Sequence, residues 1–550
     1  MLIEDSPSAS AHAPALPSGR PEKERKDREF NLSKYSTRLV AFKLAYLGKK
    51  YNGFEYHKGN WTPLPTVEEV LWKAFYKSHL IAPPGAELLK EGELSWEGTE
   101  YSKCGRTDKG VSAFGQVIGI RVRSNRPLRK RAKPDLDGGI ESIGSMIDEA
   151  HDGINTPLGE SGLQLADPPL WPSRRPVEAI AAEEMNLDDP DIEDALNFDP
   201  INDEIPYCQM LNRLLPPDIR ILAWCPSPPL DFSARFSCRE RRYKYFFTQP
   251  AFSPTPDHLE AAIHGKSPSQ TKLGWLDIEA MQEAAKLFEG EHDFRNFCKI
   301  DGSKQLSNFT REIFHSRIEE VEDYTGALAY LNDSGLRPAS KDAKNPKVYT
   351  FSLHGSAFLW HQVRHMVAIL FLIGQGLEKA PVISELLDVK KNPTRPAYQM
   401  ASDTPLVLWD CIFPRDGDPQ RTDVIRWLYV GDGTRNRGSK YENRGLMEIL
   451  WRNWHEVKID EMLAGSLMSI VANQRDTEAP LEFPTRSKPI RSQKVFEGGD
   501  GARLQGPYKP VMTKPRLDSV ETINERYAIQ KGFKKSEDLQ EFRRLKLDTE

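Results

Sequence analysis

The chain has 550 residues, of which 39% are hydrophobic and 28% are charged, and this composition is typical of a globular protein with long polar segments. No apolar run approaches the length of a membrane-spanning helix, and the N-terminus lacks the apolar core of a secretory signal, so we expect an intracellular protein with no membrane span. The six cysteines form no C-x-x-C pair, which favours reduced thiols over a disulfide framework or a zinc cage.

The net charge of −5 does not by itself indicate a nucleic-acid partner, but the charges are unevenly distributed. Glu183–Glu204 holds ten acidic residues and no basic one, whereas Arg126–Lys133 holds five basic residues and no acidic one. Outside the acidic block the chain carries a net charge of +5, so its charge is compatible with RNA binding.

Residues 1–36 are rich in Pro, Ala, Ser and alternating charges, and this composition predicts a disordered tail. An alternating strand is predicted over Leu39–Tyr46, followed by a turn at Asn52-Gly53. A helix should then begin after Thr66, because Glu69 completes a capping box and apolar residues follow at helical spacing.

The segment Tyr101–Ile120 combines a polar loop with a strand. Gly105 and Gly110 bracket a tetrad that contains Asp108, and glycine allows both a tight turn and the close approach of another backbone. Alternating apolar residues then predict a half-buried strand. A carboxylate held between Arg106 and Lys109 on a rigid strand suits a catalytic role, and it equally suits the simple capping of a turn.

From about residue 125 to 205, low hydrophobicity and high charge predict a mobile insertion, whose acidic part could compete for an RNA-binding surface. A short helix is expected from Tyr207 to the Pro216-Pro217 pair, and a strand over Arg239–Phe247. Tyr243 lies on one face of this strand, and the alternation alone indicates a core aromatic residue, because alternating aromatic residues are ordinary on strands.

A second unit begins near Trp275 with a helix capped by Asp277. Strands are predicted over Thr310–Ile318 and Val348–Leu353, and a mostly buried helix lies within Gly355–Gly376. Arg364 in this helix needs a partner, which is either Asp108 or solvent reached by snorkelling. His361 and His365 are one turn apart but lack a third ligand, so they are a weak metal candidate. Beyond about Phe413 no catalytic motif is evident.

Several separated segments, in the correct order along the chain, resemble the TruA-type tRNA pseudouridine synthases. GRTDKGVSA resembles the signature of this family, and SKCGRTDKGVSAFGQV is similar to the eukaryotic branch that modifies positions 38 and 39 in the anticodon arm. Further similar segments are the opening strand–turn–helix, LNRLLPPDIR with DFSARFSCRERRYKY, the HDF element, and AFLWHQVRHMV. The closing segment from Arg395 to Ile412 also resembles the family, although Leu406 stands in place of a glycine.

The resemblance implies an α+β fold of two similar halves, each a mixed, mainly antiparallel sheet with helices on one face, with a central basic cleft between them. The expected boundaries are a tail over 1–36, a first half over 37–250, a second half over 251–414 and a partly disordered C-terminal extension over 415–550. The implied partner is tRNA, with a homodimer as one option, no cofactor and no metal, in the nucleus and/or the cytoplasm.

The resemblance also assigns site residues. Asp108 is implied as the catalytic residue, paired with Arg364, and Tyr243 as the aromatic residue that lines the active site. The residues expected to contact RNA are Lys103, Arg106, Lys109, Arg235, Arg241, Arg242, Trp360 and His361.

The implied reaction breaks the glycosidic bond of uridine and rejoins the uracil to the same sugar through C5. Ionised Asp108 either attacks C1′ or removes a sugar proton, and the sequence does not separate these routes. Three alternatives stay open: the same chemistry at other RNA positions, a non-catalytic RNA-binding or folding module, and a glycosidase-like hydrolase. The last calls for a second carboxylate near Asp108, which the local loop lacks.

Overall fold

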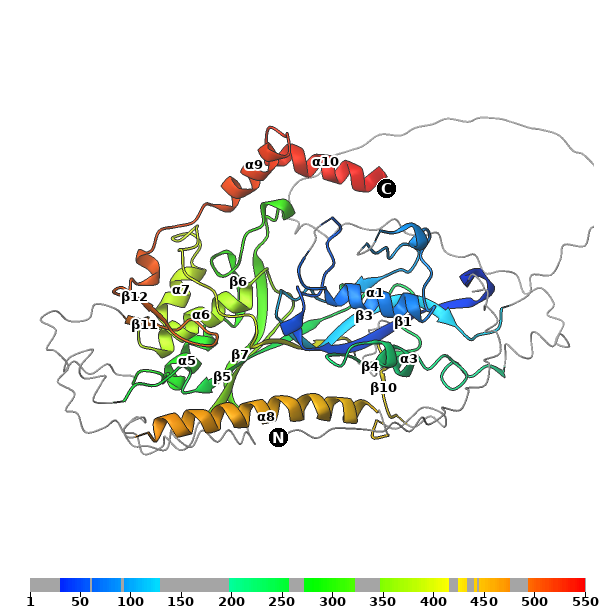
Figure 1. The fold of residues 1–550 in the computed structure, drawn as a ribbon. Coiled ribbons are helices and arrows are strands. Elements are labelled where there is room, and N and C mark those ends of the chain that lie inside the picture. The colour runs from blue at the N-terminus through cyan, green and yellow to red at the C-terminus, as the bar shows by residue number, and fades with distance from the viewer. Residues whose placement is uncertain are drawn as a thin grey trace, which may run out of the picture.

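The computed structural model describes most of the chain outside its long polar segments (Figure 1). The described residues are 30–59, 62–90, 93–128, 197–256, 272–321, 347–414, 424–432, 440–442, 445–474 and 493–549. Most of the expected tail, most of the expected insertion and several later loops therefore lie outside the described residues.

One large sheet runs through both halves of the molecule. Its strands are β1 (Ser36–Tyr46), β2 (Ser102–Lys103), β3 (Ser112–Ser124), β4 (Ile219–Cys225), β5 (Glu240–Gln249), β6 (Gly290–Asp293), β7 (Thr310–Glu320), β8 (Lys347–Gly355), β9 (Leu406–Ile412) and β10 (Leu428–Tyr429). The order is β10-β4-β1-β3-β9-β5-β8-β7-β6, and β2 pairs with β3. All neighbouring strands are antiparallel except β3 and β9, whose short parallel pairing joins the two halves.

The first half packs its sheet against α1 (Val67–Lys77) and α3 (Tyr207–Leu214). The capping box predicted for α1 is present, because the Thr66 side chain accepts a hydrogen bond from the Glu69 backbone amide. Phe42 on β1 and Phe75 on α1 are fully buried, with ring centroids 5.6 Å apart. Their contact places the helix against the sheet, as the periodicity predicted.

The second half packs α5 (Ile278–Lys286), α6 (Gln362–Gly374) and α7 (Pro381–Leu387) against β5, β7 and β8. Every residue of α6 is buried, including Arg364, because apolar side chains surround the helix on all sides. Strand β5 lies before the expected boundary at residue 250, yet it pairs with β8 from Arg241 to Gln249 and with β9 on its other edge.

The C-terminal extension contains several elements. They are α8 (Leu446–Ala472), a hairpin of β11 (Gln493–Val495) and β12 (Arg503–Gln505), α9 (Val520–Gln530) and α10 (Ser536–Thr549). Helix α8 runs beneath both halves in Figure 1 and buries none of its residues. Within the part of the chain that the structure describes, no helix is long and apolar enough to cross a membrane.

The expected α+β class with a mixed, mainly antiparallel sheet is confirmed, with the strands of the two halves joined into a single sheet. The likeness of the two halves and a basic cleft between them stay predictions. So do the four domain boundaries, although residues 32–34 of the expected tail form a short 3-10 helix and β1 begins at Ser36.

Candidate active site

The loop between β2 and β3 carries Asp108 and is held from two sides. The Phe54 amide donates a hydrogen bond to the Thr107 carbonyl oxygen at 3.1 Å, and the Tyr46 hydroxyl lies 2.8 Å from Thr107 Oγ1. Gly53 has a φ of +86°, and a Cβ there would lie 2.8 Å from the same carbonyl. Only glycine allows this close approach without strain, so the turn after β1 fixes the Asp108 loop.

The N-terminus of α6 supplies the nearest partners of Asp108. The indole Nε1 of Trp360 donates a hydrogen bond to Asp108 Oδ1 at 3.1 Å, and His361 Nε2 lies 3.5 Å from Oδ2. His361 occupies the N-cap of α6 with a φ of +61°, a conformation that is strained for a residue other than glycine. This backbone geometry turns the imidazole toward the carboxylate.

Electrostatics distinguish the two contacts. Burial raises the pKa of Asp108 to about 6, opposed by the nearby charge of Arg364, the Trp360 hydrogen bond and Lys299, and assisted by Asp403. Burial and the charges of Arg364 and Lys299 lower the pKa of His361 to about 4. At neutral pH the imidazole is therefore uncharged, and its 3.5 Å contact with Asp108 is not an ion pair.

Arg364 lies close enough to lower the pKa of Asp108, but its direct partners are different from the one expected. Its guanidinium lies 3.7 Å from Asp403 Oδ2, and its Nε donates to the Ala401 carbonyl oxygen at 2.8 Å. Among the described ion pairs, none joins Arg364 to Asp108, so the predicted direct pair is replaced by a pair with Asp403. The physical reason is that the segment before β9 packs beside α6 and brings Asp403 closer.

Tyr243 lies on β5, with its ring centroid 5.0 Å from that of Phe358 in an edge-on arrangement. Burial raises the pKa of its phenol above the ordinary value, and the negative charge of Asp108 adds to that effect. The phenol therefore keeps its proton at neutral pH. A neutral, buried phenol suits a ring that packs against a nucleobase better than a group that removes a proton.

Three of the expected RNA contacts are engaged within the protein. Lys103 pairs with the buried Glu68 at 2.6 Å, and Arg242 pairs with Glu240 at 2.6 Å. The Arg241 guanidinium donates to the carbonyl oxygens of Ser356, Cys104 and Arg235. Their cationic groups are therefore partly neutralised, or directed inward, in the free protein.

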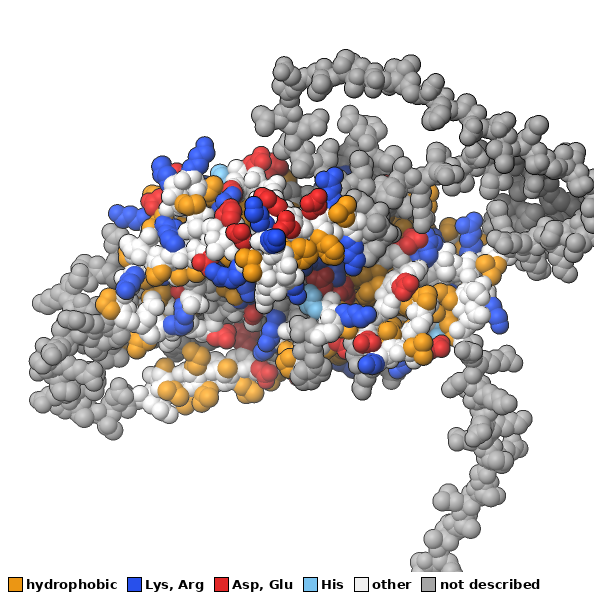
Figure 2. Space-filling view, turned by 90° about the horizontal axis from the view of Figure 1, so that it is seen from above, with side chains coloured by type: hydrophobic (Ala, Val, Ile, Leu, Met, Phe, Trp, Pro, Cys, Tyr) orange, Lys and Arg blue, Asp and Glu red, His pale blue; other side chains and the backbone are white. Residues whose placement is uncertain are grey.

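The other cationic candidates, Arg106, Lys109 and Arg235, are exposed. Partial burial of its guanidinium and the neighbouring charges of Arg106 and Arg241 lower the pKa of Arg235, so these three arginines lie near one another. Arg106 is also 3.1 Å from Glu55. On the face drawn in Figure 2, Lys and Arg side chains are interspersed with Asp and Glu rather than gathered in one patch.

Sequence reasoning missed two residues of this site. Asp403 contacts Arg364 and also approaches Gly110, where a Cβ would lie 2.8 Å from its Oδ1. The Lys299 ammonium lies 4.3 Å above the Trp360 ring, and the Lys299 amide donates to the Trp360 carbonyl oxygen. No periodicity marks either residue, and only the neighbouring family-like segments signal their location.

His361 and His365 gain no third metal ligand among the described residues. Elsewhere in the described residues, three side chains of a ligand type do come together, namely Cys104, Cys238 and Cys411. The sequence spacing argued against such a grouping, because the three cysteines are more than 100 residues apart along the chain. Distant segments meet at the junction of the two halves, and this brings them together.

With this geometry in place, the comparisons with known proteins identify the class. Residues 284–414 match the tRNA pseudouridine synthase family, and this range includes Trp360, Arg364 and Asp403. The chain belongs to this family, as the sequence resemblance predicted.

Its similarity to individual members extends well beyond that range. It is 32% identical over 519 residues to the tRNA pseudouridine(38/39) synthase of Saccharomyces cerevisiae, covering 94% of this chain and 83% of that protein. It is also 32% identical to the human tRNA pseudouridine(38/39) synthase over 505 residues, covering 90% and 78%. A more distant relative is the tRNA pseudouridine synthase A of Delftia acidovorans, 30% identical over 240 residues and covering 42% and 78%.

Proposed function

We propose that this protein converts uridine to pseudouridine in the anticodon arm of tRNA, at positions 38 and 39, with Asp108 as its catalytic residue. The observation that carries the role of Asp108 is its environment. The carboxylate is largely buried, contacts Trp360 and His361 from the other half of the molecule, and has a pKa of about 6. The similarity to tRNA pseudouridine(38/39) synthases supports the choice of substrate and position.

A pKa of about 6 suits this chemistry. At pH 7 the carboxylate is ionised in roughly nine molecules of ten, and its partial desolvation makes it more reactive than a carboxylate in water. Ionised Asp108 either attacks C1′ or removes the proton at C2′. In both routes the bond between C1′ and N1 breaks with its electron pair on N1. When C5 then bonds to C1′, the first route releases the Asp108 carboxylate from C1′, and the second returns the proton from Asp108 to C2′. A proton finally passes from C5 to N1. The product is an isomer, so no other reactant is needed.

The neighbouring residues have distinct roles in this proposal. Arg364 and Lys299 favour the ionised form of Asp108 through their positive charge, while the Trp360 indole fixes one carboxylate oxygen. Tyr243 packs against the uracil as a neutral ring. Because Asp108 is largely buried, the target uridine must leave its stack, which costs less near a loop than inside a helix.

The RNA backbone follows the exposed cations near the Asp108 loop. Arg106, Lys109 and Arg235 contact phosphates, because all three are exposed and the like charges of Arg106 and Arg235 are close together. Phosphates also displace the Glu55 carboxylate from Arg106. The basic cleft of this proposal is therefore assembled around a few cations rather than from a broad patch. The enzyme acts where tRNA matures and functions, in the nucleus, the cytoplasm or both.

The substrate assignment is tested with unmodified tRNA transcripts and the full-length protein. We expect pseudouridine at a uridine in position 38 or 39, detected by mass spectrometry of digested tRNA. Transcripts with cytidine at both positions serve as the matched control and should contain none. If both transcripts instead gain the same amount of pseudouridine, and only at other positions, the proposed position is wrong. The protein would then still be a pseudouridine synthase.

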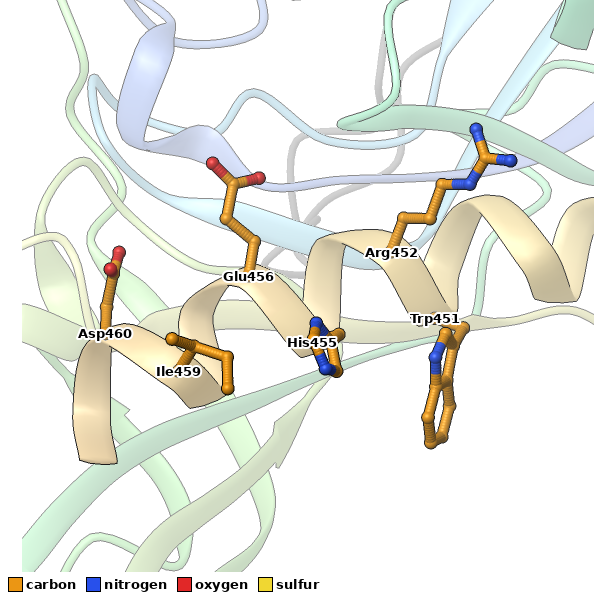
Figure 3. A pocket seen from close by; sticks show the side chains of 6 residues that line it. All are labelled: Trp451, Arg452, His455, Glu456, Ile459 and Asp460. Carbon is orange, nitrogen blue, oxygen red and sulfur yellow. The ribbon is translucent and has the colours of Figure 1, made fainter. Parts of the chain in front are cut away.

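The chain acts as a homodimer through α8. This helix has 27 residues, so it is about 40 Å long, and it buries none of them. Its exposed apolar side chains include Trp451, Leu463 and Leu467, which are 60 to 65% exposed. An apolar surface of this length favours association. In Figure 3 Trp451 points to the opposite side of the helix from Arg452, at an open hollow lined by side chains of α8.

A second copy of α8 fits this surface. Antiparallel pairing centred on Ile459 would place Trp451 opposite Leu467 and the larger Trp454 opposite the small Ala464. Such a pairing is self-complementary, which a two-fold dimer requires.

The dimer is tested by introducing one charge into α8. Sedimentation of full-length wild-type protein should give the mass of a dimer, and Leu463→Glu should give that of a monomer, because a buried unpaired charge disrupts an apolar interface. Leu88→Glu, at an exposed leucine outside α8, is the matched control and should stay dimeric. A monomeric wild type, or a dimer that survives Leu463→Glu, would exclude α8 as the interface.

A further inference from the structure

Three buried cysteines from three separate segments converge beside the Asp108 loop. Cys104 lies four residues before Asp108, Cys238 just before β5, and Cys411 on β9. All three are at most 7% exposed, and their Sγ atoms lie within 4.8 Å of one another. In the part of the chain that the structure describes, all three are free cysteines. The proposed mechanism uses none of these thiols.

The separation of the sulfur atoms matches a metal-binding site. Zinc binds cysteine sulfur at about 2.3 Å, so two sulfurs in a tetrahedral site are about 3.8 Å apart. Closing a gap of at most 4.8 Å to this value needs side-chain movements of about 1 Å or less. Thiolate ligands select soft metals such as zinc over magnesium or calcium. Packing of three thiols as small apolar groups is the alternative.

Arg241 supplies the positive charge that such a site needs. Its guanidinium is held by the carbonyl oxygens of Ser356, Cys104 and Arg235. Arg241 and Cys411 are also direct neighbours in the pairing of β5 with β9. Three thiolates and one divalent cation carry a net charge of −1, which one guanidinium neutralises. A buried charge balanced in this way avoids the cost of an unpaired ion.

We propose that Cys104, Cys238 and Cys411 bind one thiophilic divalent metal ion of the zinc class, with Arg241 as the balancing charge. Binding replaces the thiol protons, which pass to solvent, and the oxidation state of no atom changes. The ion ties the Asp108 loop to the start of β5 and to β9, so it joins the two halves at the site. It stabilises the position of the loop and takes no part in the chemistry.

The test uses the full-length protein, stripped with a chelator and titrated with Cd²⁺. Thiolate ligation of Cd²⁺ produces a sulfur-to-metal charge-transfer absorption, which should saturate at one ion per chain. Cys238→Ala should weaken Cd²⁺ binding by more than about 100-fold, since even loss of an outer partner costs about 10- to 100-fold. Cys298→Ala, at a buried cysteine outside the cluster, is the matched control and should bind Cd²⁺ like the wild type.

A second measurement needs no substitution, and so covers the case in which Cys238→Ala fails to fold. X-ray absorption of the Zn²⁺-loaded wild type should show three sulfur ligands at about 2.3 Å. Zinc held only by nitrogen or oxygen, no saturable Cd²⁺ absorption, or an absorption that survives in Cys238→Ala would each overturn the proposal. These readouts are independent of pseudouridine formation, so they do not depend on the proposed function.

Discussion

Asp108→Asn is expected to lower the rate of pseudouridine formation in tRNA by at least about 10³-fold, because removal of an attacking group abolishes the step on which all later steps depend. Asparagine keeps the size of the side chain and an oxygen that can accept the Trp360 hydrogen bond, so the site geometry should persist. Single-turnover assays with excess enzyme measure the chemical step, and filter binding measures the affinity for tRNA, which should change by less than about threefold.

The stability of the same variant provides an independent check. The pKa of Asp108 in the folded protein is about 6, above its ordinary value of 3.8. The stability that the Asp108 side chain contributes is therefore fully present below pH 3.8 and is lost as the pH rises through 6. At pH 7 the ionised carboxylate therefore destabilises the fold by about 3 kcal/mol, an order-of-magnitude figure. Asp108→Asn should accordingly melt at a higher temperature than the wild type at pH 7, and this advantage should vanish below about pH 4.

Asp388→Asn is the matched control, because Asp388 lies at the end of α7 and pairs with Lys391 on the surface. It should leave the rate unchanged. A rate for Asp108→Asn within tenfold of the wild type would exclude the proposed role of Asp108. Normal tRNA binding together with an inactive wild-type protein would instead favour the RNA-folding module.

Arg364→Gln and Asp403→Asn are expected to shift the pH dependence of the reaction in opposite directions. Arg364 lowers the pKa of Asp108 and Asp403 raises it. The rate of the wild type should fall below about pH 6, where Asp108 becomes protonated. Arg364→Gln should move this acid limb upward by about one pH unit or more, since a cation near a carboxylate lowers its pKa by about 1–3 units. The rate at pH 6 should then fall by about fivefold or more and partly recover above pH 8.

Asp403→Asn should move the same limb downward, because it removes a negative charge near Asp108 and frees Arg364 from its present partner. The measurement is the pH profile of kcat/KM, which reports groups in the free enzyme. A merely structural role of Arg364 would lower the rate equally at every pH. Parallel profiles for all three proteins would therefore rule out electrostatic control of Asp108 by this pair.

Several features could be predicted from the sequence because local patterns encode them. The capping box of α1, the alternation in β1 and β3, and the all-round apolar character of α6 each depend on residues within one turn or one strand. The glycine-bracketed loop around Asp108 is equally local, since Gly110 has a φ of +79°, which favours glycine. These patterns state which face of an element is buried and say little about what it packs against.

The partners of individual site residues were decided by the tertiary structure. Arg364 was expected to pair with Asp108, but the segment before β9 brings Asp403 closer. Arg241 was expected to contact RNA, but three carbonyl groups direct it inward toward the cysteines.

The sequence by itself determined the family, the candidate for the catalytic carboxylate and most of the regular elements. Only the tertiary structure placed Trp360 against Asp108, joined the strands of the two halves into one sheet through β3 and β9, and gathered Cys104 with two distant cysteines. The physical reason is that these contacts join residues separated by more than 100 positions. Their distances depend on how whole elements pack, and no repeating pattern within one segment records that packing.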